Sequence, residues 1–553
     1  MSEQTATTNQ PSGHSDLVAD WDRLFRVFIC PEGQASRATL IKYMDRILYG
    51  LNDFLKTNVG ITEAISLKDL SERFTDTVIN ENPEKKLADV ITCLIKDIAP
   101  HAVNVSSPYF VGHMTSAIPF FMVHLKTIIT ALNQNVVKLE TSKVVSVVEK
   151  QVIAKIHRVI YNNTEAFYRQ HVQNADSTLG VFTEGGTTAN LTALWTARNA
   201  KFQPKNGFSR GIEAEGLAAA YRAWDIDRCV VLVSRRGHYS LRKAAGILGI
   251  GNDNVIPIDI GKNNRIDLSC LKRTIRRLET EEPRTCILAI VGVAGATETG
   301  TVDPLEDLAE ISARINTHFH VDAAWGGPTL FSKKYRHLLK GISLANSVTM
   351  DGHKQFYMPM SCGMLYLKDP AALDVIAYHA NYVNRMGSVD LGIKTLSGSR
   401  EANSLILDSA LKIMGAKGYA LLIDHGIETA AAFAEEIKRR DLFELMTPPV
   451  LNILTYRICP PRIRAILNTA DDDQRRAINE KLNTVNRRLQ TIQRETGKSF
   501  VSRTTLLHNN NPNDAIVVLR SVIMNPMTTL AILNEILDEQ ERIFERELKG
   551  LLE

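Results

Sequence analysis

Short apolar strands alternate with helix-length segments through the middle of this chain, and this alternation constrains the fold more than any other feature. The apolar runs are rich in β-branched residues and cover residues 229–234, 286–295, 318–325 and 347–352. Segments of helical length, such as 268–280 and 304–316, separate them. Continuous apolar strands joined through helices are typical of a mostly parallel sheet covered on both faces. The sequence therefore predicts an α/β domain.

Regions of a different pattern flank this core. Apolar residues recur at three- and four-residue spacing before residue 99, which indicates helices. Beyond residue 377 we expect a long helix over 403–440 and a charged helix over 471–497, interpreted as a solvated surface helix or, alternatively, a partner-binding one. The predicted division is a disordered tail (1–16), a helical segment (17–106), a large domain (107–376) and a smaller α+β domain (377–553). We find no internal repeat or low-complexity linker, so these parts are expected to pack as one body.

Charge and cysteine content exclude several classes. The 553 residues include 65 Lys and Arg against 61 Asp and Glu, and a net charge of +4 gives no electrostatic case for nucleic acid or an anionic membrane. The seven cysteines form no C-x-x-C pair, so we expect reduced, mostly buried thiols and no metal site. Residues 1–16 lack the apolar core of a signal peptide. The most apolar long segment, Met114 to Leu132, contains His124 and Lys126, so we expect a buried helix there and a soluble, cytoplasmic protein.

A glycine-rich turn at 180–199, GVFTEGGTTANLTALWTARN, is the first candidate binding site. A strand-like run leads into Gly185, Gly186 and Thr187, and a helix rich in Ala and Leu follows. Free N–H groups at a helix N-terminus, with hydroxyls beside them, suit a phosphate dianion. A tight turn with a threonine cap is the alternative. The segment matches neither a P-loop nor G-x-G-x-x-G.

The second candidate is VTMDGHKQF, where His353 and Lys354 directly follow an apolar strand. A loop at the carboxyl end of a strand lies in the binding crevice of an α/β sheet. A desolvated lysine there loses its proton readily and can form an imine with a carbonyl cofactor. Taken alone, Lys354 would be interpreted as a surface lysine.

Four further residues follow strands in the same way. Asp322, in HVDAAWGG, could keep a pyridine nitrogen protonated, and the protonated ring would then be an electron sink for a carbanion. Ala324 lies two residues on, and the small residues around it leave room for a flat ring. His238 could stack on that ring or act as a base, and Thr297 offers a hydroxyl. A turn aspartate and a structural histidine are the alternatives.

These local sequences, in this order, resemble the fold-type I enzymes that use pyridoxal 5'-phosphate, and among them the group II amino acid decarboxylases. The resemblance runs from about Ser107 to the C-terminus. It implies that Lys354 forms the Schiff base, that Asp322 pairs with the pyridinium and that His238 and Ala324 cover the two ring faces. It also implies that Gly186, Thr187 and His353 lie at the phosphate, and that the protein is a homodimer whose N-terminal helices embrace the partner.

Arg520 bears on the substrate. It lies in the apolar run IVVLRSVIMNP, where an unpaired guanidinium would be costly to bury. In the glutamate decarboxylase branch a similar strand supplies the arginine that binds the distal carboxylate, so the resemblance implies an acidic amino acid. An internal salt bridge to Asp514 or Glu535 is the alternative.

Segments 106–119 and 131–149 resemble those that line the partner subunit's substrate pocket. Asn135 matches the pocket asparagine of that branch, whereas His113 replaces its glutamine, which favours a different acid. We therefore expect decarboxylation of L-aspartate to β-alanine, a precursor of pantothenate, with L-glutamate to γ-aminobutyrate as the alternative. An aminotransferase and a catalytically idle cofactor-binding protein are competing classes.

Two departures from the family pattern stand out. The stretch 378–399 corresponds to a mobile loop whose tyrosine protonates the substrate's α-carbon, but its NRMGS segment has no tyrosine. Tyr378, His379, Tyr382 or water could supply that proton; otherwise side reactions are expected. Relatives often have asparagine where Asp351 stands, and an anionic aspartate would repel the phosphate unless it is protonated or turned away.

Overall fold

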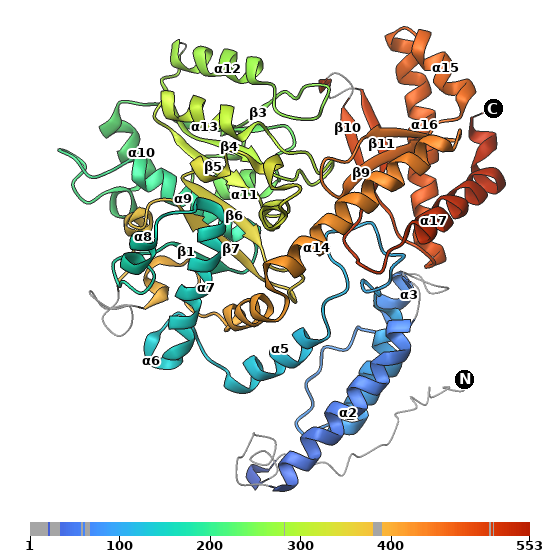
Figure 1. The fold of residues 1–553 in the computed structure, drawn as a ribbon, viewed down its shortest axis with the longest axis horizontal. Coiled ribbons are helices and arrows are strands. Elements are labelled where there is room, and N and C mark those ends of the chain that lie inside the picture. The colour runs from blue at the N-terminus through green and yellow to red at the C-terminus, as the bar shows by residue number, and fades with distance from the viewer. Residues whose placement is uncertain are drawn as a thin grey trace, which may run out of the picture. The chain divides into compact units, whose positions relative to one another are not determined.

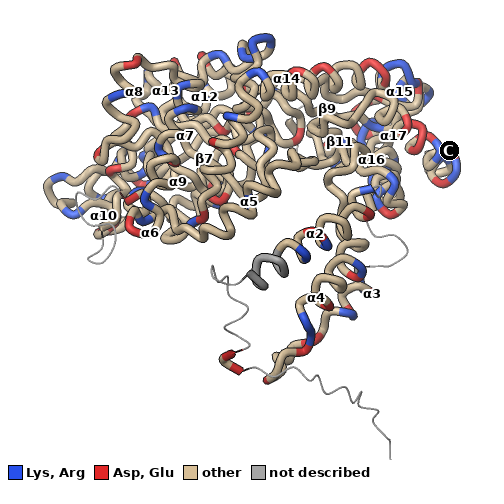
Figure 2. The backbone as a smooth tube through the Cα atoms, turned by 60° about the horizontal axis from the view of Figure 1, so that its bottom comes forward, with Lys and Arg blue, Asp and Glu red and all other residues tan. Residues whose placement is uncertain are grey.

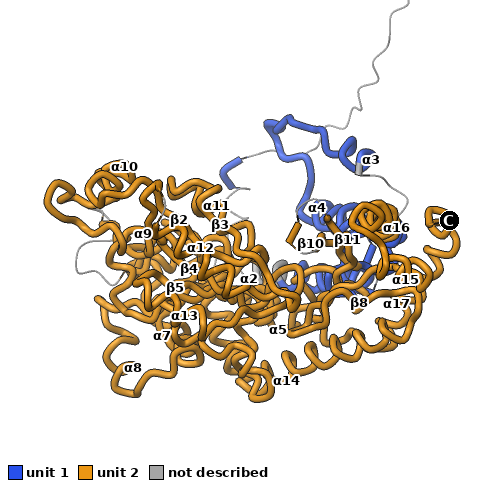
Figure 3. Tube along the Cα trace, turned by 90° about the horizontal axis from the view of Figure 1, so that it is seen from above, with its two compact units in different colours: residues 1–107, 492–500 blue, residues 108–491, 501–553 orange. Residues whose placement is uncertain are grey.

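The computed structural model describes residues 20–22, 34–56, 59–60, 67–280, 282–379, 390–507, 510–511 and 514–552. Two compact units are distinguished by their internal contacts (Figure 3). One comprises residues 1–107 with 492–500, and the other comprises 108–491 with 501–553. The predicted division at residue 376 stays a prediction, since both sides of that position belong to the second unit. The expected tail at 1–16 lies outside the described residues.

A seven-stranded sheet forms the centre of the second unit (Figure 1). Its strands, in sheet order, are β1 (Gly180–Thr183), β7 (Gly363–Leu367), β6 (Ser347–Asp351), β5 (His318–Asp322), β4 (Thr285–Val293), β2 (Arg228–Ser234) and β3 (Val255–Ile258). The pairs from β6 to β3 are parallel, and β7 is antiparallel to both of its neighbours. The predicted mostly parallel α/β architecture is confirmed. Strands β3 and β7 were not expected from the sequence.

Helices cover both faces of this sheet, because alternate residues of each strand point to opposite sides. On β2, Val230 and Leu232 belong to one apolar cluster, and Val231 and Val233 to another. The first cluster includes α7 (Val144–Tyr161), α12 (Leu268–Thr280) and α13 (Leu305–Arg314). The second includes α9 (Gly186–Lys201), α10 (Ile212–Trp224) and α11 (Ser240–Ile247). The sheet is therefore buried on both sides, as its continuous apolar strands predicted.

A second, antiparallel sheet lies in the C-terminal part of the same unit. Its order is β10 (Ser502–Leu507), β11 (Ala515–Val522), β9 (Ile453–Ile458) and β8 (Phe443–Thr447). The long predicted helix is present as α14 (Asn403–Arg439), with a kink at Gly415 where φ is +63°. The remaining helices of this unit are α5 (Phe121–Leu132), α6 (Leu139–Ser142), α8 (Glu165–His171), α15 (Pro461–Thr469), most of α16 (Asp472–Thr496) and α17 (Leu530–Ile543).

The charged helix α16 is not simply a solvated surface helix. Leu482, Val485 and Leu489 are fully buried along one side of it. Asn486 accepts a hydrogen bond from the N–H of Ile458 and donates one to its carbonyl, so it satisfies the backbone of β9. Buried polar side chains need such partners. The expectation of a solvated helix is therefore wrong for this face, because buried amides make it look hydrophilic in sequence.

The helix expected to be buried within Met114 to Leu132 is also different from the prediction. It forms α5, in which only Met122 and Ile129 are buried. The side chains of Phe120, Val123, Ile128 and Leu132 are 78%, 41%, 53% and 46% exposed. One apolar face of α5 thus has no cover within the described part of this chain.

The first unit is helical, in agreement with the periodicity before residue 99. Its elements are α2 (Gln34–Lys56), α3 (Leu67–Glu72), α4 (Leu87–Cys93) and a π-helical turn at Leu94–Ile98. Charged residues of both signs are interspersed along the surface helices of the chain, including α12, α14, α15 and α17 (Figure 2). The six described cysteines are free, and three of them are buried. No described helix is long and apolar enough to span a membrane.

Candidate active site

The strands of the large sheet direct their following loops into one cavity of about 430 Å³. Every site residue predicted from the sequence except Asn135 lines it: His113, Gly185, Gly186, Thr187, His238, Thr297, Asp322, Ala324, His353, Lys354 and Arg520. Most of these residues follow β1, β2, β4, β5 and β6, as residues at a sheet's binding edge do. Arg520 comes from β11 of the second sheet.

The N-terminus of α9 forms a cradle at one end of the cavity. Gly185 is the N-cap residue, and no side chain caps the helix, so the alternative of a threonine-capped turn does not hold. A Cβ on Gly186 would lie 3.0 Å from Asp351 Oδ2 and 3.3 Å from the Cβ of Ala324, so a larger residue would crowd this approach. Uncapped N–H groups beside small residues are the environment that a phosphate needs.

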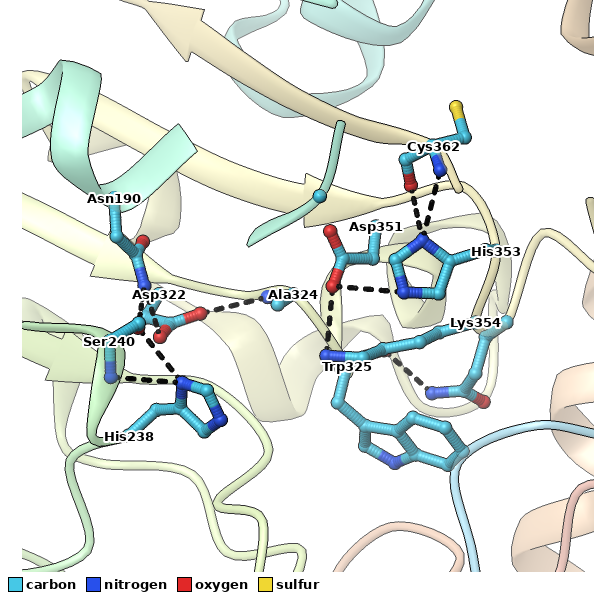
Figure 4. Close-up of polar contacts among 12 residues, drawn as sticks. Asn190, His238, Ser240, Asp322, Ala324, Trp325, Asp351, His353, Lys354 and Cys362 are labelled. Atoms are coloured by element: carbon cyan, nitrogen blue, oxygen red, sulfur yellow. Dashed lines mark hydrogen bonds and ion pairs between the residues drawn. The ribbon is translucent and has the colours of Figure 1, made fainter. Parts of the chain in front are cut away.

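Asp322 ends β5 and is 7% exposed (Figure 4). Its Oδ2 accepts a hydrogen bond from Asn190 Nδ2 at 2.9 Å, and its Oδ1 accepts one from the N–H of Ala324 at 3.2 Å. Asn190 Oδ1 in turn lies 3.0 Å from His320 Nε2. These contacts hold the carboxylate in one orientation. Sequence reasoning missed Asn190, because an asparagine within a helix gives no signal of its own.

His238 follows β2 and lies across the cavity from the Asp351 and Lys354 pair (Figure 4). Its Nδ1 accepts the backbone N–H of Ser240 at 3.3 Å and lies 2.8 Å from the Ser240 hydroxyl. These donors place the ring proton on Nε2. Burial lowers the pKa of His238, although the Asp322 charge opposes this. The ring is therefore neutral at pH 7 and presents a flat face to the cavity.

Lys354, His353 and Asp351 form a polar group beside the cradle (Figure 4). Lys354 Nζ lies 2.9 Å from Asp351 Oδ2, and His353 Nε2 lies 3.7 Å from the same oxygen. His353 Nδ1 lies 2.6 Å from the Cys362 carbonyl oxygen and 3.2 Å from the Cys362 backbone nitrogen, and these contacts hold the ring in place. Asp351 is thus neither turned away nor distant from the cradle.

Arg520 is 7% exposed and has no ion pair among the described residues. Its Nη1 donates to Ser502 Oγ at 3.2 Å, and its Nε is buried without a hydrogen-bond partner. The alternative salt bridge is therefore absent; Glu535 instead accepts the Tyr109 hydroxyl at 2.7 Å. Burial lowers the pKa of Arg520 to about 10, which leaves it charged at pH 7. A buried cation in this state calls for an anionic ligand.

A second arginine in the cavity wall was missed. Arg236 is 7% exposed, donates from Nη2 to Asn264 Oδ1 at 2.9 Å and has a buried, unpartnered Nε. Burial lowers its pKa, and the Glu298 charge opposes this. Its presence two residues before His238 was the available signal. Both guanidiniums make the cavity favourable for anions.

The two residues assigned to the partner's pocket behave differently. His113 lines the cavity of its own chain, and its expected place in a partner's pocket stays a prediction. Its pKa is lowered by burial and by the charges of Arg520 and Lys354. Asn135 lies outside this cavity, and its Oδ1 accepts the N–H of Arg400 at 3.1 Å. Its expected place in a partner's pocket stays a prediction.

The expected proton donors of the loop are only partly described. Tyr378 is 68% exposed and, like His379, is not among the residues that line the cavity. Tyr382 lies outside the described residues. Their expected role as proton donors stays a prediction.

The described residues fit the cofactor expected from the sequence. An uncapped helix N-terminus with a crowded glycine suits the phosphate, and the buried Asp322 suits a pyridinium. His238 and Ala324 provide flat or small surfaces, and Lys354 provides the amine. No described group of three or more His, Cys, Asp or Glu residues could hold a metal ion.

Comparison with known proteins agrees with this geometry. A model of the pyridoxal-dependent decarboxylase conserved domain matches residues 70–459. The chain is 44% identical over 525 residues, 95% of each protein, to an aspartate 1-decarboxylase from Aliivibrio fischeri (strain ATCC 700601 / ES114). It is 31% identical over 368 residues to an L-2,4-diaminobutyrate decarboxylase from Rhizobium meliloti (strain 1021), covering 66% of this chain and 67% of that one.

Solved structures share the fold at lower identity. The crystal structure of Oryza sativa TDC with PLP and tryptamine matches with a TM-score of 0.78 at 19% identity. The match covers 94% of this chain and 100% of that one.

Proposed function

The chain belongs to the pyridoxal-dependent decarboxylase family, and from that premise we propose that it removes the α-carboxylate of an acidic L-amino acid, L-aspartate above all. It is a carboxy-lyase with the fold-type I architecture, and its cofactor is pyridoxal 5'-phosphate. The observation that carries the choice of an acidic substrate is the buried, unpaired guanidinium of Arg520 in the cofactor cavity.

The cavity residues divide the chemistry among them. When bound, pyridoxal 5'-phosphate supplies the electron sink for the carbanion that remains after carbon dioxide leaves. Lys354 would hold the cofactor through Nζ, and Asp322 would keep the pyridine nitrogen protonated, oriented by Asn190. Gly185, Gly186 and Thr187 would bind the phosphate, together with His353. His238 and Ala324 would cover the two faces of the ring, and Thr297 would bind at its edge.

Arg520 would bind the distal carboxylate of the substrate. A charge-assisted hydrogen bond in a buried site both binds and orients its partner. This orientation would leave the α-carboxylate to be lost rather than the distal one. His113 lies in the same wall as a neutral ring beside Arg520, so it would shape this subsite without adding charge.

L-Aspartate is preferred to L-glutamate for two reasons. The relative that is 44% identical over 95% of both chains is an aspartate 1-decarboxylase. An imidazole at position 113 is bulkier than an amide, which favours the shorter acid. We also propose that the product, β-alanine, serves pantothenate synthesis in the cytoplasm.

A substrate panel tests the proposal. The purified holoenzyme is incubated with L-aspartate, L-glutamate, cysteine sulfinate and L-2,4-diaminobutyrate while carbon dioxide and the amine product are measured. We expect the highest kcat/KM for aspartate, with β-alanine as product. A preference for diaminobutyrate would contradict the acidic substrate, and a keto acid without carbon dioxide would contradict decarboxylation. A preference for glutamate would keep the acid class and change the product to γ-aminobutyrate.

The exposed apolar face of α5 supports a homodimer. Phe120, Val123, Ile128 and Leu132 lie along this face, and Val144 and Val147 at the start of α7 are 65% and 45% exposed. Clusters of large exposed apolar residues mark protein interfaces. We propose that a second copy of the chain covers this surface and that the active sites are shared across it.

A further inference from the structure

The two carboxyl oxygens of Asp351 lie in different electrostatic environments within the cavity. Asp351 is the last residue of β6 and is 2% exposed. Its Oδ2 lies 2.9 Å from Lys354 Nζ, so the carboxylate is the counter-ion of the lysine. Its Oδ1 is also buried but has no hydrogen-bond partner. One oxygen is therefore neutralised, and the other has lost its solvation without compensation.

The same carboxyl group faces the phosphate cradle. Its Oδ2 and Oδ1 lie 3.0 and 3.2 Å from the point where Gly186 would carry a Cβ. A phosphate dianion held by this cradle would lie on the same side as the buried carboxylate, and repulsion between the two anions would keep both from staying fully charged. A neutral carboxylic acid could instead donate its O–H to the phosphate.

Lys354 carries a proton that would neutralise the Asp351 carboxylate and so remove its repulsion of a bound phosphate. An ammonium group has no lone pair, so Lys354 must become a neutral amine before its Nζ can bond to the cofactor's aldehyde carbon. Asp351 Oδ2 is within hydrogen-bond distance of that Nζ. The lysine must lose a proton in the same event in which the aspartate needs one.

We propose that Asp351 takes the ammonium proton of Lys354 when the cofactor binds and holds it as a carboxylic acid that donates to the phosphate. One N–H bond of Lys354 breaks and one O–H bond of Asp351 forms, so the pair keeps its net charge of zero. Asp351 thereby acts as a donor at the phosphate, and it also activates the lysine.

Other ionisable groups lie around Asp351, but those described do not replace Lys354 as the source of its proton. His353 Nε2 lies 3.7 Å from Asp351 Oδ2, and its Nδ1 is in contact with the backbone of Cys362. The Cys362 thiol has its pKa raised by burial, and the Asp351 charge adds to this, so it stays protonated. Asp322, His238 and Glu184 line the same cavity from β5, the loop after β2 and the end of β1. Among the ionisable groups of the described residues, Lys354 is the one that lies within 3 Å of the Asp351 carboxyl.

Difference infrared spectroscopy tests the proton directly. Spectra of the holoenzyme minus the apoenzyme are recorded for the wild type and for Asp351→Asn, without substrate. We expect the carbonyl stretch of a protonated carboxyl group in the wild type, sensitive to deuterium exchange and to ¹³C-aspartate labelling, and its absence in Asp351→Asn. Retention of the carboxylate stretch of Asp351 in the wild-type holoenzyme would overturn the proposal.

Phosphorus NMR and cofactor titrations complete the test. The ³¹P shift of bound pyridoxal 5'-phosphate should report a dianion in both proteins; a singly protonated phosphate in the wild type would place the proton on the cofactor and also overturn the proposal. Asp351→Asn should keep the equilibrium affinity for the cofactor, because its amide N–H still donates, but it should slow the reaction of Lys354 with the cofactor, because an amide cannot take the lysine proton. Asp351→Ala should weaken the affinity by roughly 10- to 150-fold, the worth of one hydrogen bond to a charged group. Melting curves of the apoproteins establish that the variants fold.

This inference rests on the cofactor and not on the amino-acid substrate. All of its measurements are made on binding without turnover. A failure to release carbon dioxide from aspartate would contradict the proposed substrate and leave the role of Asp351 unaffected.

Discussion

The buried guanidinium of Arg520 has no ion pair among the described residues. We therefore expect this residue to control the affinity for the substrate. A charge-assisted hydrogen bond is worth about 1.5 to 3 kcal/mol, so Arg520→Ala should raise KM for L-aspartate by roughly 10- to 150-fold. Arg520→Lys should give a smaller increase, because it keeps the charge but loses the planar fork. Steady-state kinetics on the holoenzyme measure both variants.

Arg503 provides a matched control for Arg520. It lies on the neighbouring strand β10, exposed to solvent, with Nη1 donating to the Arg487 carbonyl at 3.2 Å. Arg503→Ala should leave KM within a factor of two. An unchanged KM in Arg520→Ala would remove Arg520 from the substrate subsite.

At the residue scale, the sequence predicted side chains that follow strands and missed those that act through others. Asp322 is the last residue of a strand, and Lys354 and His238 lie in the loops that follow strands, so their meeting at one edge of the sheet follows from topology. Asn190 orients Asp322 from within a helix, where nothing in the local sequence distinguishes it from a structural asparagine. The position of Asp351 against Gly186 depends on the end of β6 and the start of α9, about 165 residues apart in sequence, and only the folded chain defines it.

At the scale of elements, helix α7 is tied to the rest of its unit by a buried ion pair. Glu149 and Arg400 form two hydrogen bonds, with side chains only 3% and 6% exposed. Removing one member leaves the other charge buried and uncompensated, so Glu149→Gln should lower the free energy of unfolding by about 3 to 5 kcal/mol. Chemical denaturation measures this loss.

An adjacent ion pair serves as the control. Glu401 pairs with Lys126, but both side chains are partly exposed. Glu401→Gln should therefore cost less than about 1 kcal/mol. Equal losses for the two variants would show that burial of the Arg400 pair does not set its strength.

His157, which also lies in α7, should make the free energy of unfolding depend on pH. His157 Nδ1 lies 2.9 Å from the Tyr168 hydroxyl and Nε2 lies 3.0 Å from the Leu367 carbonyl. Burial lowers the pKa of His157 to about 4. The unfolded chain then binds a proton at higher pH than the folded chain. The stability that comes from keeping His157 neutral is fully present above pH 6.5. It is lost as pH falls toward 4, at roughly 1.4 kcal/mol per pH unit.

His157→Gln should reduce this acid dependence. The glutamine can still donate to Leu367 but cannot take up a proton, so the unfolding free energy of the variant should fall less steeply between pH 6 and 4.5. Replacement of the exposed His124 by glutamine should leave the slope unchanged. Denaturation midpoints over this pH range measure both. A wild-type slope in His157→Gln would contradict the assignment.

Helices and strands whose apolar residues follow a simple period were predicted well. Elements that mix polar and apolar residues on the same face were not. The parallel strands are continuous apolar runs because helices cover both faces. Strand β3 is short and contains Pro257, a residue that is rare inside strands. Helix α16 looks fully polar because asparagine side chains fill part of its buried face. Helix α5 looks buried because its exposed face is apolar as well.

At the scale of the whole molecule, the cavity combines the large sheet with the second one. Lys354 and Asp322 come from the first sheet and Arg520 from β11, and the strands that carry them lie in the same compact unit. Cofactor chemistry and substrate selection are thus assigned to different sheets. A change on β11 should alter specificity without loss of the cofactor.

The apolar face of α5 leads to the last prediction, which concerns assembly. Wild-type protein should sediment as a dimer, and Phe120→Asp should weaken dimerisation by at least tenfold, because burying a large apolar side chain is worth about 1.5 to 3 kcal/mol. Ile466→Asp on α15, where the side chain is 42% exposed outside that face, should leave the dimer intact. If active sites are shared, kcat should fall with the dimer fraction as Phe120→Asp is diluted. Monomeric wild type, or equal effects of the two substitutions, would contradict an interface at α5, and a monomer with full activity would contradict shared sites.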